Sequence, residues 1–343
     1  MNVKRALVIG FYCTIGDIDS LNRVTAWLAE KNVRYTVAPF GGPVLDAIPG
    51  SVLPETVNPK DFTHVIIVCG PCDREYYARR WPIDPAAFAH CHFIGVNLSM
   101  IRSLDEWEPF DTLLERDSSR KVRPDLTLLL EPRKTPVFGL CIAPAQPEYK
   151  DRQMNAYASR LLRSVARKMD AAVIMIDTGW PKELNDTGLE SEAQIESLIA
   201  RVDVLLTTRL HGTVYAIKNQ VPPLVLDPIR GGDKVISQAR VLGWPSAYLA
   251  DKVTEEELIA GLKFCMSPEG KRKTEESVAN ARILLADVRQ EFMAALESGP
   301  QGAYERWPER IVEQRSFIER AEGVSKRYAR KLGHVLLKLG DTN

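Results

Sequence analysis

The sequence predicts an α/β fold with two Rossmann-like domains whose parallel sheets face a cleft, followed by a helical C-terminal extension. Short, nearly continuous runs of Val, Ile and Leu alternate with longer amphipathic segments. Such runs are typical of strands buried on both faces of a parallel sheet. The same rhythm starts again after Pro136, and 343 residues are enough for two domains.

Each half carries its own set of expected elements. In the first half, the strands are Arg5–Gly10, Val33–Ala38, His64–Val68 and Phe93–Leu98, and the helix is Ile18–Lys31. In the second half, the strands are Val137–Ile142, Ala172–Ile176, Val202–Leu206, Pro223–Leu226 and Ala247–Leu249. The helices between them are expected at about Arg152–Lys168, Glu192–Ala200, Gly212–Lys218 and Lys234–Val241.

The domain boundary is expected in residues 131–136, a charged stretch with two prolines. This gives an N-terminal domain over residues 1–133 and a C-terminal domain over 134–298. A helical tail over 299–343 follows a break at Gly299–Pro300.

Composition excludes several classes of protein. The 45 basic and 45 acidic residues cancel, so no general nucleic-acid partner is expected. No apolar run reaches the roughly 18 residues that cross a bilayer. The N-terminus enters a strand-like run at once, without the apolar core of a signal peptide, so a cytoplasmic protein is expected. The six cysteines lie among apolar runs, as reduced, buried thiols do.

The strongest signal for a functional site is residues 202–212, where a buried strand leads through a polar turn into a helix. Thr207 and Thr208 are expected to cap this helix with their side-chain oxygens. Arg209 and His211 then lie at its positive end, beyond the carboxyl end of the strand, where ligands of such sheets bind. A cation beside free backbone N–H groups is a receptor for phosphate or carboxylate. His211 adds a group that exchanges a proton near neutral pH.

The same residues also have a purely structural interpretation. Arg209 would then pair with a nearby carboxylate, and His211 would fill a gap between helix and sheet. Gly212 leaves room for the close approach of a ligand or of other parts of the chain. Position alone leaves both interpretations open.

This segment resembles the polysaccharide pyruvyl transferase family. The family signature is Arg-Leu-His after a buried strand, then a helix, a Gly-Val-Pro-like turn and another strand. The matching residues are Arg209–Leu210–His211, Asn219–Gln220–Val221–Pro222 and Leu224–Asp227, with Gln220 in place of glycine. Lys234 resembles the lysine that often follows the last core strand of the family.

Weaker matches lie upstream. Thr14–Ile15–Gly16–Asp17 resembles the family's Asn-x-Gly-Asp, with Thr in place of Asn. Arg116–Asp117–Ser118 resembles its Arg-Asp-x-x-Ser element, and Pro124–Asp125–Leu126 the Pro-Asp segment that follows. The glycine-rich loop of the family falls at Cys69–Gly70–Pro71–Cys72, where one glycine remains.

The resemblance implies a GT-B-like transferase that moves a pyruvyl group from phosphoenolpyruvate to a saccharide or polysaccharide precursor as a ketal. Such a reaction serves cell-surface or exopolysaccharide biosynthesis, with the acceptor on the N-terminal domain and the donor on the C-terminal domain. It implies His211 as the acid that protonates the donor and Asp17 as a base. Arg209 and the expected substrate-binding residues Arg116, Lys234, Leu210, Gly212, Gly16 and Thr208 would hold the substrates. Beyond phosphoenolpyruvate, no metal or cofactor is implied.

Three of these residues have structural alternatives. Asp17 is also placed to cap the first helix. Arg116 and Asp117 would form an ion pair between the domains, and Lys234 would be an ordinary exposed helix residue.

Two other functions compete with the pyruvyl transferase. One is a GT-B-like glycosyltransferase that takes a nucleotide sugar, because basic residues at strand ends would hold its phosphates as well. The other is a non-catalytic saccharide-binding protein of the same fold, which the altered loop Cys69–Cys72 keeps open.

Two further patterns have competing interpretations. Cys69 and Cys72 have the spacing of a redox dithiol, and His90–Cys91–His92 could join them around zinc, but alternation in a strand points Cys91 away from the two histidines. In the tail, apolar residues at helical spacing (Val324, Tyr328, Leu332, Val335, Leu336 and Leu339) accompany Lys and Arg. This helix would pack on the body or on a partner chain, or rest on an anionic membrane beside a lipid-linked acceptor.

Overall fold

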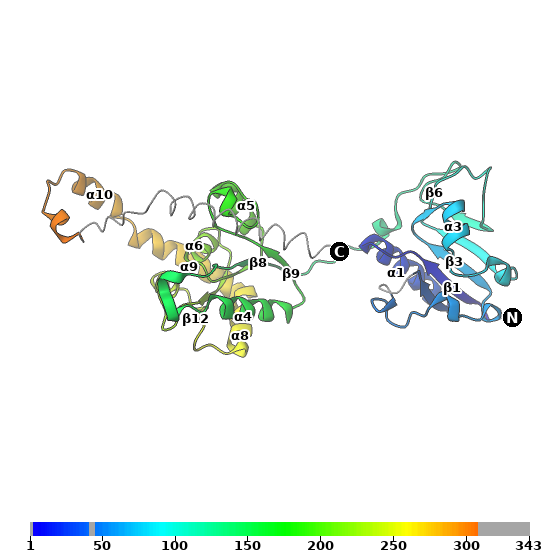
Figure 1. The fold of residues 1–343 in the computed structure, drawn as a ribbon, viewed down its shortest axis with the longest axis horizontal. Helices are drawn as coiled ribbons and strands as arrows, with labels where there is room; N and C mark the ends of the chain where they lie inside the picture. Colours follow the sequence, from blue (N-terminus) through cyan, green and yellow to red (C-terminus); the bar gives the residue numbers. More distant parts are fainter. Residues whose placement is uncertain (1–2, 41–44, 308–343) are drawn as a thin grey trace, which may run out of the picture. The chain divides into compact units, whose positions relative to one another are not determined.

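The structure is a computed structural model that describes residues 3–40 and 45–307. The chain divides into two compact units between Lys134 and Thr135 (Figure 1). Each unit has its own five-stranded sheet and its own hydrophobic core. The predicted roles of the two domains stay predictions, and the basic amphipathic helix predicted beyond Val324 lies outside the described residues.

Unit 1 is a parallel sheet with strand order β2-β1-β3-β5-β7. Its strands are β1 (Arg5–Gly10), β2 (Arg34–Pro39), β3 (His64–Val68), β5 (His92–Val96) and β7 (Thr112–Leu114), with β4 (Pro71–Cys72) and β6 (Ser99–Met100) paired separately. Its α-helices include α1 (Ile15–Glu30) and α3 (Arg74–Arg80). Short 3-10 helices are η1 (Pro54–Thr56), η2 (Pro59–Asp61), η3 (Pro85–Phe88) and η4 (Leu126–Leu129).

The strands of unit 1 are buried on both faces, as the continuous apolar runs predict. Leu7 and Ile9 of β1 belong to one hydrophobic cluster, and Ala6 and Val8 to another. Because successive side chains of a strand point to opposite faces, the two clusters cover opposite sides of the sheet. The parallel α/β architecture expected from the sequence is therefore confirmed here.

Unit 2 is a second parallel sheet, with order β12-β11-β10-β8-β9. Its strands are β8 (Val137–Cys141), β9 (Ala172–Met175), β10 (Val204–Thr207), β11 (Pro223–Asp227) and β12 (Ala247–Leu249). Its α-helices are α4 (Asn155–Arg167), α5 (Glu192–Ile199), α6 (Leu210–Lys218), α7 (Lys234–Val241), α8 (Glu255–Met266), α9 (Pro268–Leu284) and α10 (Val288–Leu296). Short 3-10 helices are η5 (Pro147–Arg152), η6 (Lys182–Leu184) and η7 (Ala303–Arg306).

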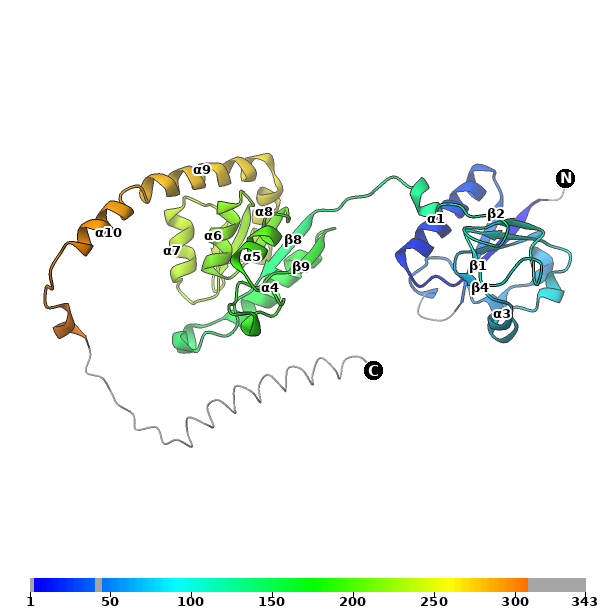
Figure 2. The same cartoon turned by 90° about the horizontal axis from the view of Figure 1, so that it is seen from above.

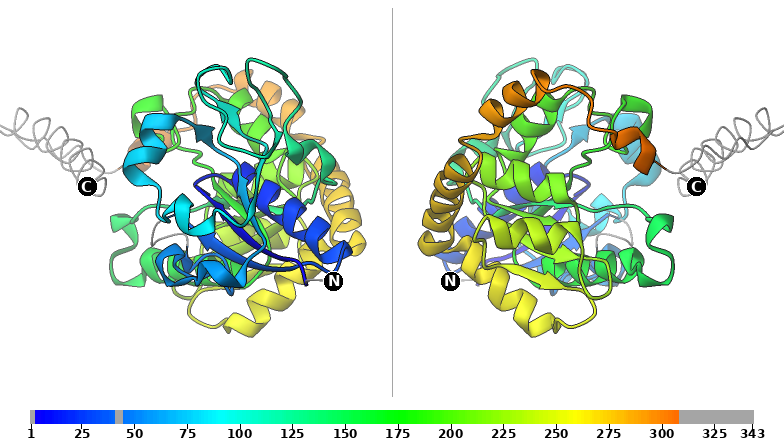
Figure 3. Two further views of the ribbon diagram at one scale, coloured as in Figure 1. Left: turned by 90° about the vertical axis from the view of Figure 1, so that its right-hand side faces the viewer. Right: turned by 90° about the vertical axis from the view of Figure 1, so that its left-hand side faces the viewer.

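The helices of unit 2 cover its sheet, as the green-to-orange ribbon in the right-hand view of Figure 3 shows. Helix α9 packs against α6 and α8, and α10 continues in the same direction (Figure 2). Every helix among the described residues is too short or too polar to span a bilayer.

The strand order reverses once in each sheet. The first strand of unit 1, β1, lies between β2 and β3, and the first strand of unit 2, β8, lies between β9 and β10. Loops that leave such a pair of strands run in opposite directions and open a crevice at the carboxyl end of the sheet, where ligands of these folds bind. This point of the strand order lies between β8 and β10 in unit 2 and between β1 and β3 in unit 1.

Several boundaries differ from the sequence predictions. The first helix begins at Ile15 rather than Ile18, because Thr14 caps it in a reciprocal capping box. Helix α4 begins at Asn155 rather than Arg152, because η5 extends to Arg152. Helix α3 was not predicted.

Candidate functional site

The crevice of unit 2 contains a pocket of about 400 Å³. Loops that follow strands β8, β9 and β10, together with the start of α7, form its walls. Five residues predicted from the sequence line it: Thr208, Arg209, Leu210, His211 and Lys234. The structure therefore gathers the predicted donor-binding residues of the C-terminal domain in one place.

Arg209 is held in position by contacts to two neighbouring strand ends. Its Nη2 lies 2.7 Å from Asp177 Oδ1, its Nε donates to the carbonyl oxygen of Ile142 at 2.9 Å, and its Nη1 donates to Thr178 Oγ1 at 3.4 Å. The Arg209 side chain keeps 20% of its surface exposed. A guanidinium has five N–H donors, so two remain for a ligand. The structural pairing and the ligand-binding interpretation are thus both compatible with this geometry.

The predicted capping by the two threonines is wrong. The N-cap of α6 is Arg209, with no side-chain capping bond among the described residues. Thr207 Oγ1 instead accepts the Arg209 N–H at 3.0 Å and donates to the Cys141 carbonyl at 2.9 Å. Thr208 Oγ1 accepts the N–H of Ala143 at 2.7 Å. Both hydroxyls fasten the loops after β8 and β10 to each other, because the helix begins later than the threonines.

The uncapped start of α6 bears directly on anion binding. The first N–H groups of a helix lack partners inside the helix and carry its positive end. His211 is the second residue of α6, is exposed and lies 6.5 Å from Tyr215, ring centre to ring centre. An anion in the pocket would therefore face open N–H groups, the Arg209 guanidinium and the His211 imidazole together.

Gly212 is needed for packing. It is buried, and a Cβ at this position would lie closer than 3.0 Å to Thr207 Oγ1 and 3.2 Å from Cys141 Sγ. The room that the sequence predicted at Gly212 is thus used by the chain itself, because it lets α6 pack closely against the ends of β8 and β10. Gly212 sets the position of Arg209 and His211 and offers no side chain to a ligand.

Lys234 reaches the pocket from the first turn of α7. Its Nζ lies 5.8 Å from the ring centre of Tyr149, and it is exposed and has no ion pair within the described residues. The loop before it is fixed by the fully buried Asp227, whose carboxylate accepts the N–H groups of Ile229, Asp233 and Ile236 at 2.9 Å each. The site thus has a second cation on a firmly held helix end.

The residues predicted in unit 1 have clear structural partners. Asp17 Oδ2 accepts the N–H of Cys13 at 3.1 Å and both the N–H and the hydroxyl of Thr14 at 2.9 Å. Thr14 is the N-cap of α1, and Asp17 at the third helical position closes the capping box, so Asp17 supports the helix start without being the cap itself. Its role as a base stays a prediction. Gly16 lies within the same first turn of α1, half-buried.

Arg116 is also engaged within unit 1. Its Nη1 donates to Asp125 Oδ2 at 3.0 Å, its Nε to Asp117 Oδ2 at 3.3 Å, and its Nη2 to the hydroxyl of Ser99. The buried Asn97 joins the network by donating to Asp125 Oδ2 at 3.1 Å. The Arg116–Asp117 pair therefore lies inside unit 1, and the expectation of a pair between domains is wrong.

The cysteine pattern does not favour redox chemistry. Cys69 and Cys72 are buried and free. Burial raises the pKa of both thiols, that of Cys72 to about 12, whereas a redox-active dithiol needs a lowered pKa. No group of three or more His, Cys, Asp or Glu residues in the described part of the chain is arranged to hold a metal ion.

Sequence reasoning missed Asp177, the partner that orients Arg209. Asp177 is 6% exposed, and its carboxylate also accepts the N–H groups of Gly179 and Asp186. It lies two residues after β9 and directly after the predicted strand Ala172–Ile176, so an acidic residue at a predicted strand end was the available signal. A neighbouring pocket of about 780 Å³ shares Arg209 with the first and adds Arg160 and Arg163 of α4.

The chain therefore has two Rossmann-like units, and the second has a pocket lined by Arg209, His211 and Lys234 at the carboxyl end of its sheet. Residues 113–228 match the model of the polysaccharide pyruvyl transferase family, a family of transferases. The match confirms the resemblance predicted from Arg209–Leu210–His211. It includes Arg116, whereas Asp17 and Lys234 lie outside it.

Solved structures that resemble the chain include several enzymes of sugar metabolism. Spinosyn rhamnosyltransferase SpnG complexed with thymidine diphosphate is 10% identical, with 82% of this chain and 100% of that chain covered and a TM-score of 0.29. The UDP-GlcNAc 2-epimerase of Methanocaldococcus jannaschii is 12% identical, with 82% and 99% covered and a TM-score of 0.28. Glycosyltransferase VinC in complex with dTDP is 12% identical, with 86% and 100% covered and a TM-score of 0.31. Curated proteins give no match.

One departure from the family pattern is visible in the backbone. Gln220, which stands in place of the usual glycine, has a φ of 58°. This is the left-handed region that glycine adopts without steric cost. The turn therefore keeps the shape that a glycine would favour, although its residue has changed.

Proposed function

We propose that the protein transfers a pyruvyl group from phosphoenolpyruvate to a saccharide and that the pocket around Arg209 binds the donor. The observation that carries the proposal is the gathering of Arg209, His211 and Lys234 around one pocket at the open start of α6. Phosphoenolpyruvate carries a phosphate and a carboxylate. The two free N–H groups of Arg209, the Lys234 ammonium and the helix amides suit these anions.

In the proposed reaction, His211 gives a proton to the methylene carbon of the donor. The adjacent carbon becomes cationic, and a sugar hydroxyl attacks it. Phosphate then leaves as its C–O bond breaks, and a second hydroxyl of the same sugar closes the ketal. Of the two protons that the hydroxyls lose, one replaces the proton given by His211 and the other goes to the phosphate. The enzyme thus ends the cycle in its starting state.

The residues have separable tasks in this scheme. Asp177 orients Arg209, and Gly212 lets α6 approach the sheet, so both position the site without touching the donor. Leu210 and Thr208 form part of the wall of the pocket around Arg209. We propose a cytoplasmic location and a saccharide acceptor, lipid-linked or soluble, as the sequence predicts.

The test is calorimetric titration of the full chain with phosphoenolpyruvate. Lys234→Gln should weaken binding about ten-fold or more, since a charged hydrogen bond contributes about 1.5–3 kcal/mol. Lys252→Gln, at an exposed lysine outside the pocket lining, is the matched control and should bind as the unaltered protein does. Unchanged affinity in Lys234→Gln would remove this residue from the site.

Turnover is tested by phosphate release from phosphoenolpyruvate in the presence of saccharides. His211→Asn should retain donor binding and lose acceptor-dependent release. Release that never depends on a saccharide would point to a non-catalytic saccharide-binding protein. Binding of a nucleotide sugar in place of phosphoenolpyruvate would point to a glycosyltransferase, and either result would overturn the proposal.

A further inference from the structure

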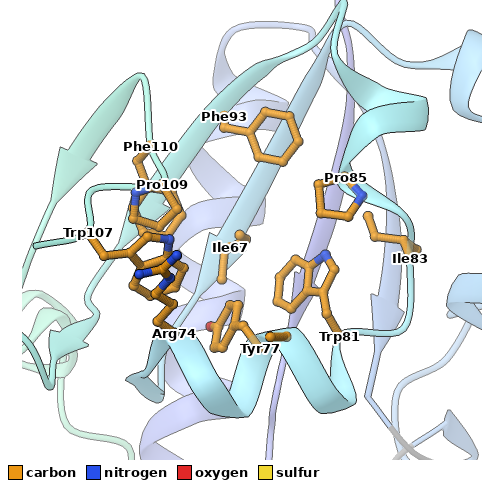
Figure 4. Close-up of a pocket in the computed structure, with 11 residues that line it drawn as sticks. Ile67, Arg74, Tyr77, Trp81, Ile83, Pro85, Phe93, Trp107, Pro109 and Phe110 are labelled. Carbon is orange, nitrogen blue, oxygen red and sulfur yellow. The ribbon is translucent and has the colours of Figure 1, made fainter.

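Unit 1 contains a second, chemically different pocket of about 380 Å³. Its walls come from α3, from the residues after α3 and from the segment before β7, with Ile67 of β3 and Phe93 of β5 between them (Figure 4). The lining is largely apolar and aromatic, with Arg74 as its charged member. It contains none of the residues assigned to the donor or acceptor from the sequence.

The aromatic walls are fixed by contacts among themselves. The rings of Tyr77 and Trp81 stack with their centres 4.4 Å apart, and Trp107 meets Tyr77 edge-on at 6.0 Å. Phe40 supports Trp81 from another side at 5.0 Å. Burial raises the pKa of the Tyr77 hydroxyl, which lies against the Cys72 thiol, so this ring stays neutral. Rings held in this way offer flat apolar surfaces without a large loss of side-chain entropy on binding.

One polar side chain of this pocket is open to a ligand. Arg74, exposed at the start of α3, has neither an ion pair nor a side-chain hydrogen bond in residues 3–40 and 45–307. The indole nitrogen of Trp81 is buried, and in Figure 4 it lies on the side toward Pro85, so a ligand in the pocket would meet the apolar part of this ring. The pocket therefore combines aromatic walls with one cation that is open to an anion.

We propose that this pocket binds a small aromatic anion, a flat ring that carries a carboxylate or phosphate group. The ring would lie against Trp81 and Trp107, and the anion would pair with Arg74. Ligand pockets of this size are typically apolar, with a few placed polar groups that fix orientation.

Other ligands fit the lining less well. A sugar ring would bury several hydroxyls, but the pocket supplies few polar groups to receive them, and each unpaired hydroxyl weakens binding. An aliphatic chain would fill the apolar space, but it would lose more conformational entropy than a rigid ring and could not stack on the aromatic walls. The aromatic anion matches both the aromatic walls and the cation of the pocket.

The experiment is calorimetric titration of the full chain with 1-naphthyl phosphate. Arg74→Gln should weaken binding about ten-fold, the usual effect of losing one charge-assisted hydrogen bond. Arg79→Gln, on the same helix but outside the lining, should bind normally. Ala78→Trp, which fills the pocket from an exposed position on α3, should abolish binding.

Controls separate this pocket from the donor site. Excess phosphoenolpyruvate should not displace the probe, and Ala78→Trp should bind phosphoenolpyruvate normally, so the two proposals can fail independently. Thermal unfolding of each variant verifies that it folds. No binding of the probe, binding that survives Ala78→Trp, displacement by phosphoenolpyruvate, or tighter binding of methyl glucoside or farnesyl phosphate would each overturn the proposal.

Discussion

Replacing Gly212 by alanine tests how the start of α6 is positioned. The added Cβ would lie closer than 3.0 Å to Thr207 Oγ1, whereas ordinary Cβ contacts lie at 3.4–4 Å. Something must therefore move, and the movable part is the first turn of α6. We expect Gly212→Ala to displace the turn that carries Arg209 and His211.

The expected magnitude follows from the packing. Extra methyl groups in a filled core cost about 1–3 kcal/mol. Thr207→Ala removes the clashing oxygen but also two hydrogen bonds, to Cys141 and Arg209, each contributing about 1 kcal/mol. If the clash is the whole cause, the double variant should be destabilised by little more than Thr207→Ala alone. The two changes should therefore be coupled by nearly the whole cost of Gly212→Ala, about 1–3 kcal/mol.

Native-state hydrogen exchange of amides in β10 measures this coupling, because it reports the opening of unit 2 rather than of the whole chain. Gly212→Ala should also weaken phosphoenolpyruvate binding, and Thr207→Ala should restore part of it. Additive free energies, within about 0.5 kcal/mol, would show that the glycine is needed for another reason, and the packing argument would fail.

Three further predictions concern buried polar groups and thiols. Asp227→Asn should lower the free energy of unfolding by about 2–3 kcal/mol, because an amide nitrogen would replace an oxygen that accepts backbone N–H groups. Urea titration measures this change, and a free energy of unfolding close to that of the unaltered protein would contradict the prediction. Burial raises the pKa of Asp125, but hydrogen bonds from a backbone amide, an arginine and an asparagine outweigh it and hold the pKa below the ordinary 3.8. The ionised Asp125 therefore stabilises the fold above pH 3.8, and this stabilisation is lost as the pH falls through the lower pKa of the folded state. In Asp125→Asn, the melting temperature should depend less on pH in the acid range. An unchanged slope of melting temperature against pH would refute this. In the native protein, the exposed Cys13 should react rapidly with a thiol reagent at pH 8, and Cys69 and Cys72 only on unfolding; prompt reaction of either would indicate a redox-active pair.

The local pattern of the sequence determined most of the elements. Strands Arg5–Gly10, His64–Val68 and Ala247–Leu249 have the predicted bounds, because a short apolar run between polar turns is a local signal. The direction of a strand is equally local, so the sequence also places Arg209 and His211 beyond the carboxyl end of β10. Helix α3 was missed because Arg74–Arg80 is short and polar, and its role depends on the aromatic rings that it brings to the sheet.

Contacts between distant segments were decided by the tertiary structure. The order of strands places β9 and β10 on either side of β8, and this brings Asp177 to Arg209. The same packing gave Thr207 and Thr208 partners on the loop after β8 in place of the expected capping role. The aromatic pocket likewise combines segments that are separated along the chain. The spacing of apolar residues shows which face of a helix or strand is buried. It does not show which residues pack against that face, because these depend on the packing of the whole sheet and its helices.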